Sequence, residues 1–339
     1  MNSASTTSSP AFPAARKRFP YLGSGLRWLV TLLVLVWGVR QISPSAILSS
    51  LQGIDPLAFG MALSASAAGL LCSVARWWLL LRAFPSAQAT SFSSLLRLTW
   101  IGLFFNTFVP GNVGGDLWRA HRTRHLFTAP WQAYLIVSLE RIVGLMGLGS
   151  LWVLGFFWLQ QSQGLPVELG RLSAIAWLGL WTSGAALVLA FAPLLSPVTR
   201  LLQRRKIHAR GADLSGVYLG SWLLSLGSQA AVVLSAHVLM QSLHPQGLTL
   251  AASFCFAPLA VLATYLPALA GIGPREMTFA YLFSTLGFPR ADAVAASLAL
   301  LATQLVFALS GGLLYLLRLR FAPFPDSERR AFGDVAKPC

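Results

Sequence analysis

Long apolar segments follow one another along almost the whole chain, separated by short polar loops. Most of them reach the roughly 20 residues that a helix needs to cross the hydrocarbon core of a bilayer. They are rich in Leu and Ala and do not alternate between apolar and polar residues, so they predict helices and not barrel strands. The segments are 25–42, 57–82, 94–110, 132–159, 172–195, 214–241, 249–269, 277–288 and 291–317.

The composition agrees with burial in lipid. Of the 339 residues, 55% are hydrophobic and only 10% are charged, whereas a typical soluble domain is about one quarter charged. A chain that spans a bilayer has to satisfy its own backbone hydrogen bonds there. We therefore expect an all-α fold, a polytopic bundle of membrane helices without a sizeable soluble domain.

Positive charge is concentrated in the loops. The formal net charge is +15, which in a soluble protein would suggest a nucleic-acid partner. Here the basic residues gather beside apolar segments, at 16–18, 204–206 and 318–320. This placement fits the excess of Lys and Arg in cytoplasmic loops and contact with anionic headgroups. We expect membrane lipids as partners, and no nucleic acid.

The first half of the topology follows from these loops. Basic residues 16–18 place the N-terminus in the cytoplasm, and loop 43–56, which lacks Lys and Arg, lies outside. The second span then returns to the inside near Arg82, and the basic loop 119–125 is inside as well. The segment between Arg82 and this loop therefore predicts a re-entrant hairpin that opens on the cytoplasm.

The same charge rule, applied to the second half of the chain, predicts a hairpin of the opposite orientation. Loop 196–213 is the most basic of the chain and is expected inside, as is the tail that follows 318–320. Segment 249–288 must then begin and end outside. The sequence predicts about six full spans plus two oppositely oriented re-entrant helical hairpins, with both termini cytoplasmic.

One membrane domain is expected to account for nearly the whole chain. Residues 1–24 predict a disordered cytoplasmic lead, 25–318 a single transmembrane domain, and 319–339 a short cytoplasmic tail. The lead and the apolar run 28–39 have the order of a signal peptide, but residues 40–44 offer no small-x-small cleavage site. We interpret the run as an uncleaved first span, with an organelle transit peptide as the alternative.

Two Pro/Gly-rich stretches, 109–119 and 266–276, interrupt apolar surroundings and resemble each other. Each has an apolar residue, Pro, three residues and Gly, followed by one acid and one Arg. Such paired interruptions in two halves are typical of discontinuous helices that face a central site; simple interfacial turns are the alternative. The residues expected to shape the hairpins are Pro110, Gly111, Gly114, Gly115, Pro267, Gly271 and Gly273.

Glu140 and Arg141 follow an apolar run and precede another. A charge at mid-bilayer costs about 2.5–3.5 kcal/mol on insertion scales, so it usually faces a partner or water. Adjacent helical residues do not face each other, which predicts separate partners, with Asp116 or Glu276 for Arg141. In the alternative, both side chains extend from the membrane edge into the headgroup region.

His121 and His125 have the i, i+4 spacing of a helical metal pair. The nearest carboxylate is Asp116, and Arg122 and Arg124 would repel a cation, so a solvated basic face is the favoured interpretation. We expect no metal and no cofactor. The same arginines suit lipid phosphate at the inner leaflet.

Catalytic signatures are absent from the sequence: there is no phosphate-cradling GxxxxGK[ST], no HExxH and no GxSxG. The acids near membrane segments are Asp116, Glu140 and Glu276, and general acid–base chemistry built from them is the open alternative. We expect a transporter and not an enzyme.

These elements occur as an ordered set: Asn106-x3-Pro110-Gly111-x2-Gly114-Gly115-Asp116-x2-Arg119, then Glu140-Arg141-x2-Gly144, then Pro267-x3-Gly271-Ile272-Gly273-Pro274-Arg275-Glu276. The set resembles the transmembrane region of the lysylphosphatidylglycerol synthase family, flippase-like membrane proteins of bacteria and archaea. The resemblance covers about 25–318 and implies the bacterial cytoplasmic membrane. One departure is Glu140, where the family more often has Asp.

The resemblance implies a lipid-handling domain in which two opposed re-entrant elements form a central cavity. In bifunctional members an aminoacyl-transfer domain follows the membrane region; because this chain ends at residue 339, we expect that activity to be missing. The leading hypothesis is a translocase for a polar, aminoacylated or glycosylated lipid. The alternatives are a non-translocating subunit or enzyme of lipid modification, partnered with a separate transferase, and a scaffold. The expected headgroup path is Asp116, Arg119, Arg141, Arg275 and Glu276, supported by Asn106 and Glu140.

Overall fold

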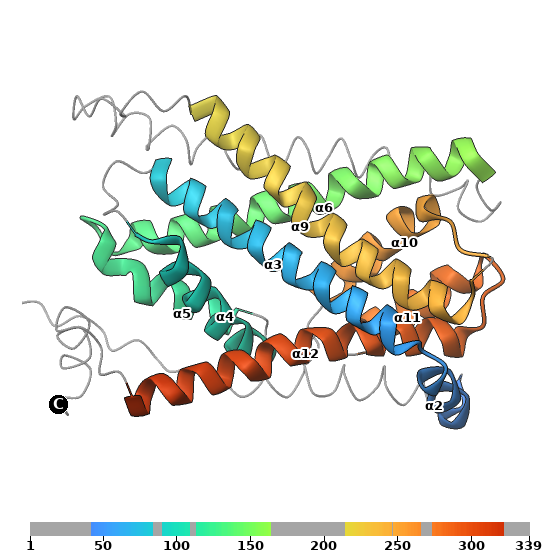
Figure 1. The fold of residues 1–339 in the computed structure, drawn as a ribbon. Helices are drawn as coiled ribbons and strands as arrows, with labels where there is room; N and C mark the ends of the chain where they lie inside the picture. Colours follow the sequence, from blue (N-terminus) through green and yellow to red (C-terminus); the bar gives the residue numbers. More distant parts are fainter. Residues whose placement is uncertain are drawn as a thin grey trace, which may run out of the picture.

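A computed structural model describes residues 42–83, 90–108, 113–163, 214–245, 247–265 and 273–321. Within these ranges the regular structure is entirely helical, which confirms the all-α fold class (Figure 1). The helices are α2 (Pro44–Gln52), α3 (Pro56–Ala83), α4 (Phe92–Phe108), α5 (Gly114–Thr123), the 3-10 turn η1 (Arg124–Leu126), α6 (Trp131–Gln163), α9 (Leu214–Leu243), α10 (Leu250–Ala263), α11 (Pro274–Ser284) and α12 (Arg290–Phe321).

Four of the described helices contain spans that are long and apolar enough to cross a membrane. They are Pro56–Arg82 in α3, Trp131–Ser162 in α6, Gly216–Leu243 in α9 and Arg290–Leu317 in α12. They correspond to four of the six predicted full spans. The other two, 25–42 and 172–195, lie outside the described residues, as do the predicted lead 1–24 and most of the tail 319–339.

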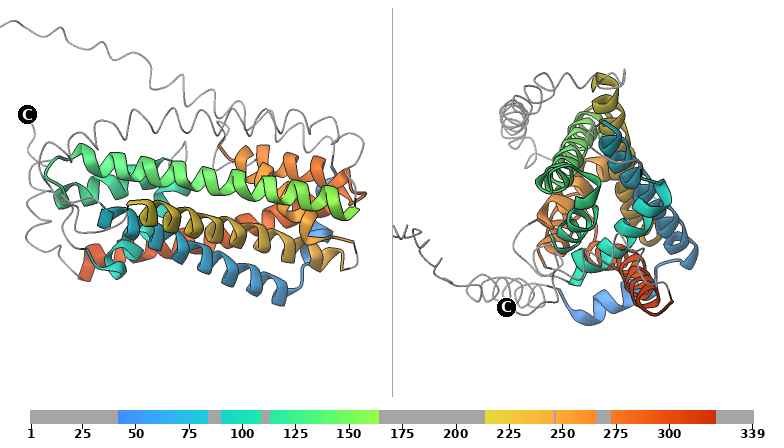
Figure 2. Two further views of the ribbon diagram at one scale, coloured as in Figure 1. Left: turned by 90° about the horizontal axis from the view of Figure 1, so that it is seen from above. Right: turned by 90° about the vertical axis from the view of Figure 1, so that its left-hand side faces the viewer.

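The four long helices form one elongated bundle (Figure 2). In Figure 1, α3 and α12 run from right to left, whereas α6 and α9 run from left to right. The C-terminal ends of α3 and α12 therefore lie at the same end of the bundle as the N-terminal ends of α6 and α9. These are the relative directions that the predicted topology requires.

Between the long helices lie two units of two short helices each. The first is α4 followed by α5, with 17 and 10 residues, and the second is α10 followed by α11, with 14 and 11 residues. Figure 1 shows the first unit in the left half of the bundle and the second in the right half. The predicted interruptions fall between the described ends of these helices, Phe108 and Gly114 in the first unit and Ala263 and Pro274 in the second. Pro110, Gly111, Pro267 and Gly271 lie outside the described residues.

One element differs from the predicted segmentation. The predicted outside loop 43–56 contains α2, which begins at Pro44, a residue whose fixed φ and missing N–H suit the first helical position. By contrast, α6 is one continuous helix of 33 residues that covers the predicted segment 132–159, and Glu140 and Arg141 lie between two and three turns inside it.

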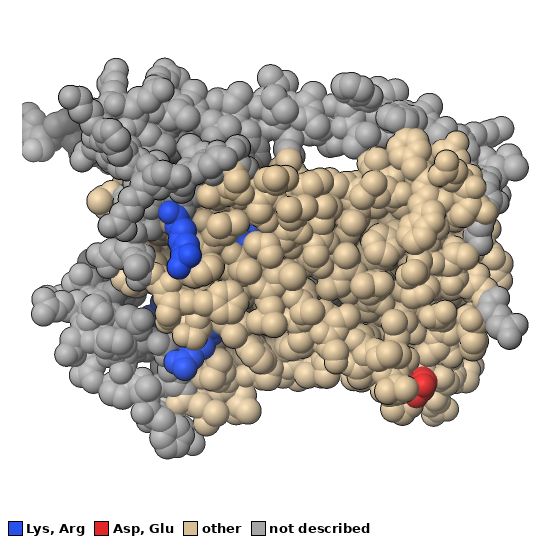
Figure 3. Space-filling model, turned by 45° about the horizontal axis from the view of Figure 1, so that its top comes forward, with Lys and Arg blue, Asp and Glu red and all other residues tan. Residues whose placement is uncertain are grey.

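The core is apolar between the helices, and so is the surface. Phe256, Phe279 and Phe283 are almost completely buried where α10 and α11 meet, and Phe279 stacks on Phe283 with ring centroids 5.3 Å apart. Large apolar side chains such as Leu154 and Leu316 are exposed, as expected of a surface that faces lipid. On the face drawn in Figure 3, Lys and Arg lie toward the left end and acidic residues toward the right.

Candidate functional site

The site is built around the beginning of α5. The side chain of Asn106, near the end of α4, accepts a hydrogen bond from the backbone N–H of Gly115 at 2.7 Å. A Cβ on Gly115 would lie 2.0 Å from the carbonyl oxygen of Gly102, so the two helices pack backbone to backbone at this point. Asn106 and Gly115 thus fix α5 against α4 and place the next residue, Asp116, inside the bundle.

Asp116 and Glu140 hold three arginines from three helices together. Arg119 Nη2 donates to Asp116 Oδ1 at 2.7 Å and to Glu140 Oε2 at 2.7 Å. Arg76 Nη2 donates to Glu140 Oε1 at 2.6 Å, and Arg141 Nε donates to Asp116 Oδ2. These five residues, from α3, α5 and α6, form a continuous chain of ion pairs that we call the arginine cluster.

The arginine cluster is buried and carries excess positive charge. Three guanidinium groups against two carboxylates leave a formal charge of +1. Four of the five side chains are at most 9% exposed, whereas that of Arg141 is 29% exposed. Buried charges are tolerated when they are paired and hydrogen-bonded, which the four inner members are. Arg141 is therefore the most accessible member of the cluster.

Arg76 is the member of the cluster that sequence reasoning missed. Besides Glu140, its guanidinium donates to Ser225 Oγ at 2.9 Å and to Ser228 Oγ at 3.4 Å, both on α9. The available signal was a lone arginine inside the apolar segment 57–82, where an unpaired charge would be costly. Arg76 therefore ties α9 to the cluster through neutral hydroxyl groups.

The second unit reaches the arginine cluster at the C-terminal end of α10. There the guanidinium carbon of Arg141 lies 6.0 Å from the ring centroid of Tyr265, at the outer limit for a cation–π contact. Tyr265 itself is 47% exposed. The end of α10 thus lies beside Arg141, the partly exposed member of the cluster.

The equivalent charges of the second unit, Arg275 and Glu276, form a separate and closed arrangement. Glu276 accepts the backbone N–H of Gly273 at 2.7 Å and Arg275 Nη2 at 2.8 Å. Arg275 also donates to Ser297 Oγ at 3.1 Å and to Gln304 Oε1 at 3.2 Å, both on α12. Arg275 is 1% and Glu276 4% exposed, so this neutral pair fastens the start of α11 to α12.

The structure therefore brings together only part of the predicted headgroup path. Asp116, Arg119 and Arg141 lie in one cluster with Glu140, and Asp116 is the partner of Arg141, one of the two predicted. The alternative in which Glu140 reaches the membrane edge is wrong, because its side chain is 3% exposed and bound by two arginines. Within the described residues, no ion pair or hydrogen bond links the cluster to Arg275 or Glu276.

The residues that follow the cluster, at the end of α5 and in η1, are basic and at least partly exposed at His121, Arg122 and Arg124. Arg122 lies over the ring of Trp118, with its guanidinium carbon 4.3 Å from the centroid. Burial, followed by the charges of Arg124 and Arg122, lowers the pKa of the His121 imidazole from its ordinary value. In the described part of the chain, no group of three or more His, Cys, Asp or Glu side chains is placed to hold a metal ion.

The fold and the arginine cluster define a class: a multi-pass helical membrane protein with two units of short helices and buried charges packed against the long helices. The model of the family described as lysylphosphatidylglycerol synthase TM region matches residues 25–312, and the chain belongs to that family. The membership indicates a membrane protein of lipid modification or translocation. A search of curated proteins found no match.

Proposed function

We propose that this protein is a lipid translocase, which moves a polar, aminoacylated or glycosylated lipid across a bacterial cytoplasmic membrane. The observation that carries the proposal is the buried cluster of three arginines and two carboxylates, in which Arg141 is partly exposed. A guanidinium group binds phosphate through charge-assisted, frequently paired hydrogen bonds. In this proposal the lipid phosphate pairs with Arg141, and Asp116 balances the arginines or binds a headgroup amine.

The arrangement of the two short-helix units supports the same mechanism. Interrupted helices inside a membrane are tolerated where they line a cavity, and their free ends can hold a polar group there. We propose that α4–α5 and α10–α11 enter the membrane from opposite faces as re-entrant hairpins. The headgroup would then pass beside Arg141 and Tyr265, where α6 meets the end of α10.

The proposal includes the orientation and the partners. The basic end of the bundle faces the cytoplasm, and both termini are cytoplasmic, because Lys and Arg are enriched in cytoplasmic loops. The chain moves lipid and does not transform it, and a separate transferase would make the lipid. The proposed path uses Asp116, Arg119 and Arg141, whereas Arg275 and Glu276 hold α11 in place.

Lipid movement in liposomes tests the proposal directly. The purified protein is reconstituted with fluorescent lipids of several headgroups, and a membrane-impermeant quencher reports which molecules reach the outer leaflet. Protein-dependent exposure of one headgroup class, lost in Arg141→Gln and in Asp116→Asn, is the expected result. The matched control is Arg97→Gln, which removes the same charge from an exposed position on α4.

Two outcomes would contradict the proposal. If no headgroup is exposed although the reconstituted protein is folded, the chain does not move lipid under these conditions and a role in lipid modification gains weight. If Arg97→Gln abolishes movement as completely as Arg141→Gln does, the general positive charge of the protein matters and the arginine cluster is not the site.

A further inference from the structure

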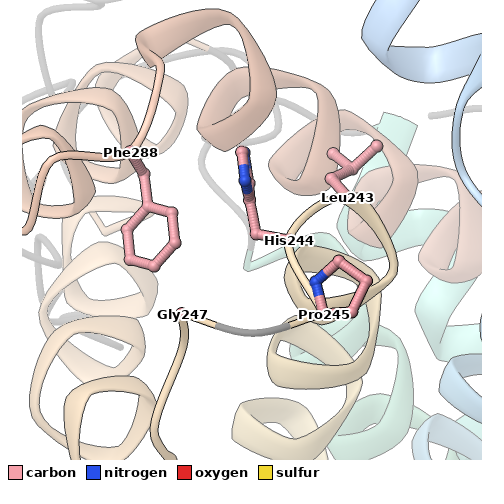
Figure 4. Close-up of a pocket in the computed structure, with 5 residues that line it drawn as sticks. All are labelled: Leu243, His244, Pro245, Gly247 and Phe288. Carbon is pink, nitrogen blue, oxygen red and sulfur yellow. The ribbon is translucent and has the colours of Figure 1, made fainter.

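A pocket lies at the end of the bundle opposite to α5 (Figure 1). Its volume is about 470 Å³, and Figure 4 shows the residues around it: Leu243, His244, Pro245, Gly247 and Phe288. His244 follows the span Gly216–Leu243 directly, and Phe288 lies two residues before the span Arg290–Leu317. The pocket is therefore located where two spans end, at the level of lipid headgroups.

His244 is held in one orientation by a carboxylate beside the pocket. Its Nε2 lies 2.6 Å from Asp292 Oδ2, and Ser50 Oγ donates to Asp292 Oδ1 at 2.5 Å. Because an ionised carboxylate only accepts hydrogen bonds, this geometry assigns a proton to Nε2. Among the described side chains that line the pocket, only that of His244 is polar, so its Nδ1 is the side-chain atom left to bind a ligand.

The charge state of His244 decides which ligand chemistry fits. In the neutral ring, Nδ1 accepts a hydrogen bond, whereas in the protonated ring it donates one. A phosphate offers no donor to the neutral ring, and an ammonium group is repelled by the protonated ring. A hydroxyl group both donates and accepts, so it alone among these three pairs with His244 in either state.

The walls of the pocket fit the apolar parts of such a ligand. Phe288 lies edge to face with His244 at a centroid distance of 5.2 Å, and Leu243 and Pro245 supply further apolar surface. A sugar or glycerol group presents C–H surface between its hydroxyls. A pocket with apolar walls and a few fixed polar groups is typical of small-molecule sites.

We propose that this pocket binds a hydroxylated headgroup, a sugar or a glycerol, through a hydrogen bond to His244 Nδ1 and apolar contact with Phe288. Nothing in this site belongs to the arginine cluster, and the binding does not depend on whether the chain moves lipid. Asp292 and Ser50 act by fixing the imidazole, and they link α2 and α12 to the loop after α9.

Ligand-detected NMR on the full-length protein in nanodiscs tests the proposal. The probes are hexyl β-glucoside, free glucose and hexylphosphocholine, which has the same chain without a hydroxylated headgroup. We expect the glucoside to bind and the phosphocholine not to compete with it. His244→Ala removes the hydrogen bond and is expected to weaken glucoside binding about two- to tenfold.

A second variant probes the pocket without removing His244. A Cβ on Gly247 would lie 3.2 Å from the ring of Phe288, so Gly247→Val narrows the space between them and is also expected to weaken binding. The control is Gly149→Val on α6, where an added Cβ meets nothing within 4 Å. Arg97→Gln, at an exposed position on α4 outside both sites, should also leave glucoside binding unchanged.

The outcomes separate the possible sources of the hydroxyl groups. Tighter binding of the glucoside than of glucose supports a lipid-borne headgroup, whereas equal binding supports the same site with a soluble sugar. The proposal would be overturned if His244→Ala and Gly247→Val both bound the glucoside as tightly as the unchanged protein does. Displacement of the glucoside by hexylphosphocholine would also overturn it, because the site would then recognise the alkyl chain or the phosphate.

Discussion

The two interrupted-helix units carry similar motifs but organise their charges differently. In the first unit, Asp116 and Arg119 reach outward from α5 to residues of α6 and, through Glu140, to Arg76 on α3. In the second unit, the pair at the start of α11 satisfies itself within one turn and against α12. The first arrangement is a network between elements, and the second is a local helix cap.

This difference indicates which unit is suited to bind a charged ligand. A neutral pair that is almost fully buried has no unbalanced charge to offer, and its hydrogen bonds stabilise the start of a helix. The arginine cluster joins three arginines to two carboxylates and leaves one arginine partly exposed, so it is better suited to meet an anionic ligand. Sequence similarity between two motifs therefore does not imply that they have the same role.

The largest predicted effect follows from the central position of Glu140 in the network. Glu140→Ala removes the carboxylate shared by Arg76 and Arg119 and leaves both guanidinium groups buried with too little negative charge. We expect the free energy of unfolding to fall by about 3–5 kcal/mol, the usual cost of breaking a buried ion pair by removing one partner. Denaturant titration in mixed micelles measures it.

Glu140→Asp is the matched control for this variant, because it keeps the charge and shortens its reach by one methylene group. We expect it to lose much less stability than Glu140→Ala. If Glu140→Ala is as stable as the unchanged protein, the arginine cluster is not a network whose members depend on one another, and the contrast with the second unit disappears.

The next prediction concerns the buried ion pair of the second unit, Arg275 and Glu276. Glu276→Gln removes the charge beside Arg275, which keeps its hydrogen bonds to Ser297 and Gln304 on α12. We expect a loss of about 2–3 kcal/mol, in the range of hydrogen bonds to charged groups. Lipid movement by the folded fraction should be preserved, whereas Asp116→Asn should reduce it. Equal losses of lipid movement in the two variants would show that both units contribute to the headgroup path.

Much of this contrast could not be predicted from the sequence. The positions of the interruptions were predictable because Pro and Gly break helices, and Asp116 as a partner of Arg141 was foreseen because a buried charge requires one. Arg76 was missed because its partners on α6 and α9 are more than 60 positions away in the chain. The sequence alone could not show that the charges of the first unit form a network between helices whereas those of the second unit cap one helix. That difference depends on which helix packs against each motif.

Close packing in the first unit provides a third prediction. Gly115→Ala would bring a methyl group against the backbone of Gly102, so α5 has to move away from α4 and shift Asp116 with it. We expect a loss of about 1–3 kcal/mol, as for other overpacked sites. Gly149→Ala is the control, because its Cβ meets nothing within 4 Å and Ala favours a helix over Gly. Denaturant titration in mixed micelles measures both variants. Equal stability of Gly115→Ala and Gly149→Ala would contradict the prediction.

The smallest predicted effect concerns the residue that precedes the second helix of each unit. Gly273 precedes α11 with φ 99°, a conformation that side chains other than Gly rarely adopt, whereas Val113 precedes α5 with φ −117°. Gly273→Ala should therefore cost about 1–2 kcal/mol of stability, and Val113→Ala, at a 45% exposed position, should cost clearly less.

Because the N–H of Gly273 binds Glu276, the conformation of Gly273 and the ion pair of Glu276 with Arg275 depend on each other. Combining Gly273→Ala with Glu276→Gln should then cost less than the sum of the two single losses, and additive losses would show that the turn and the cap are independent.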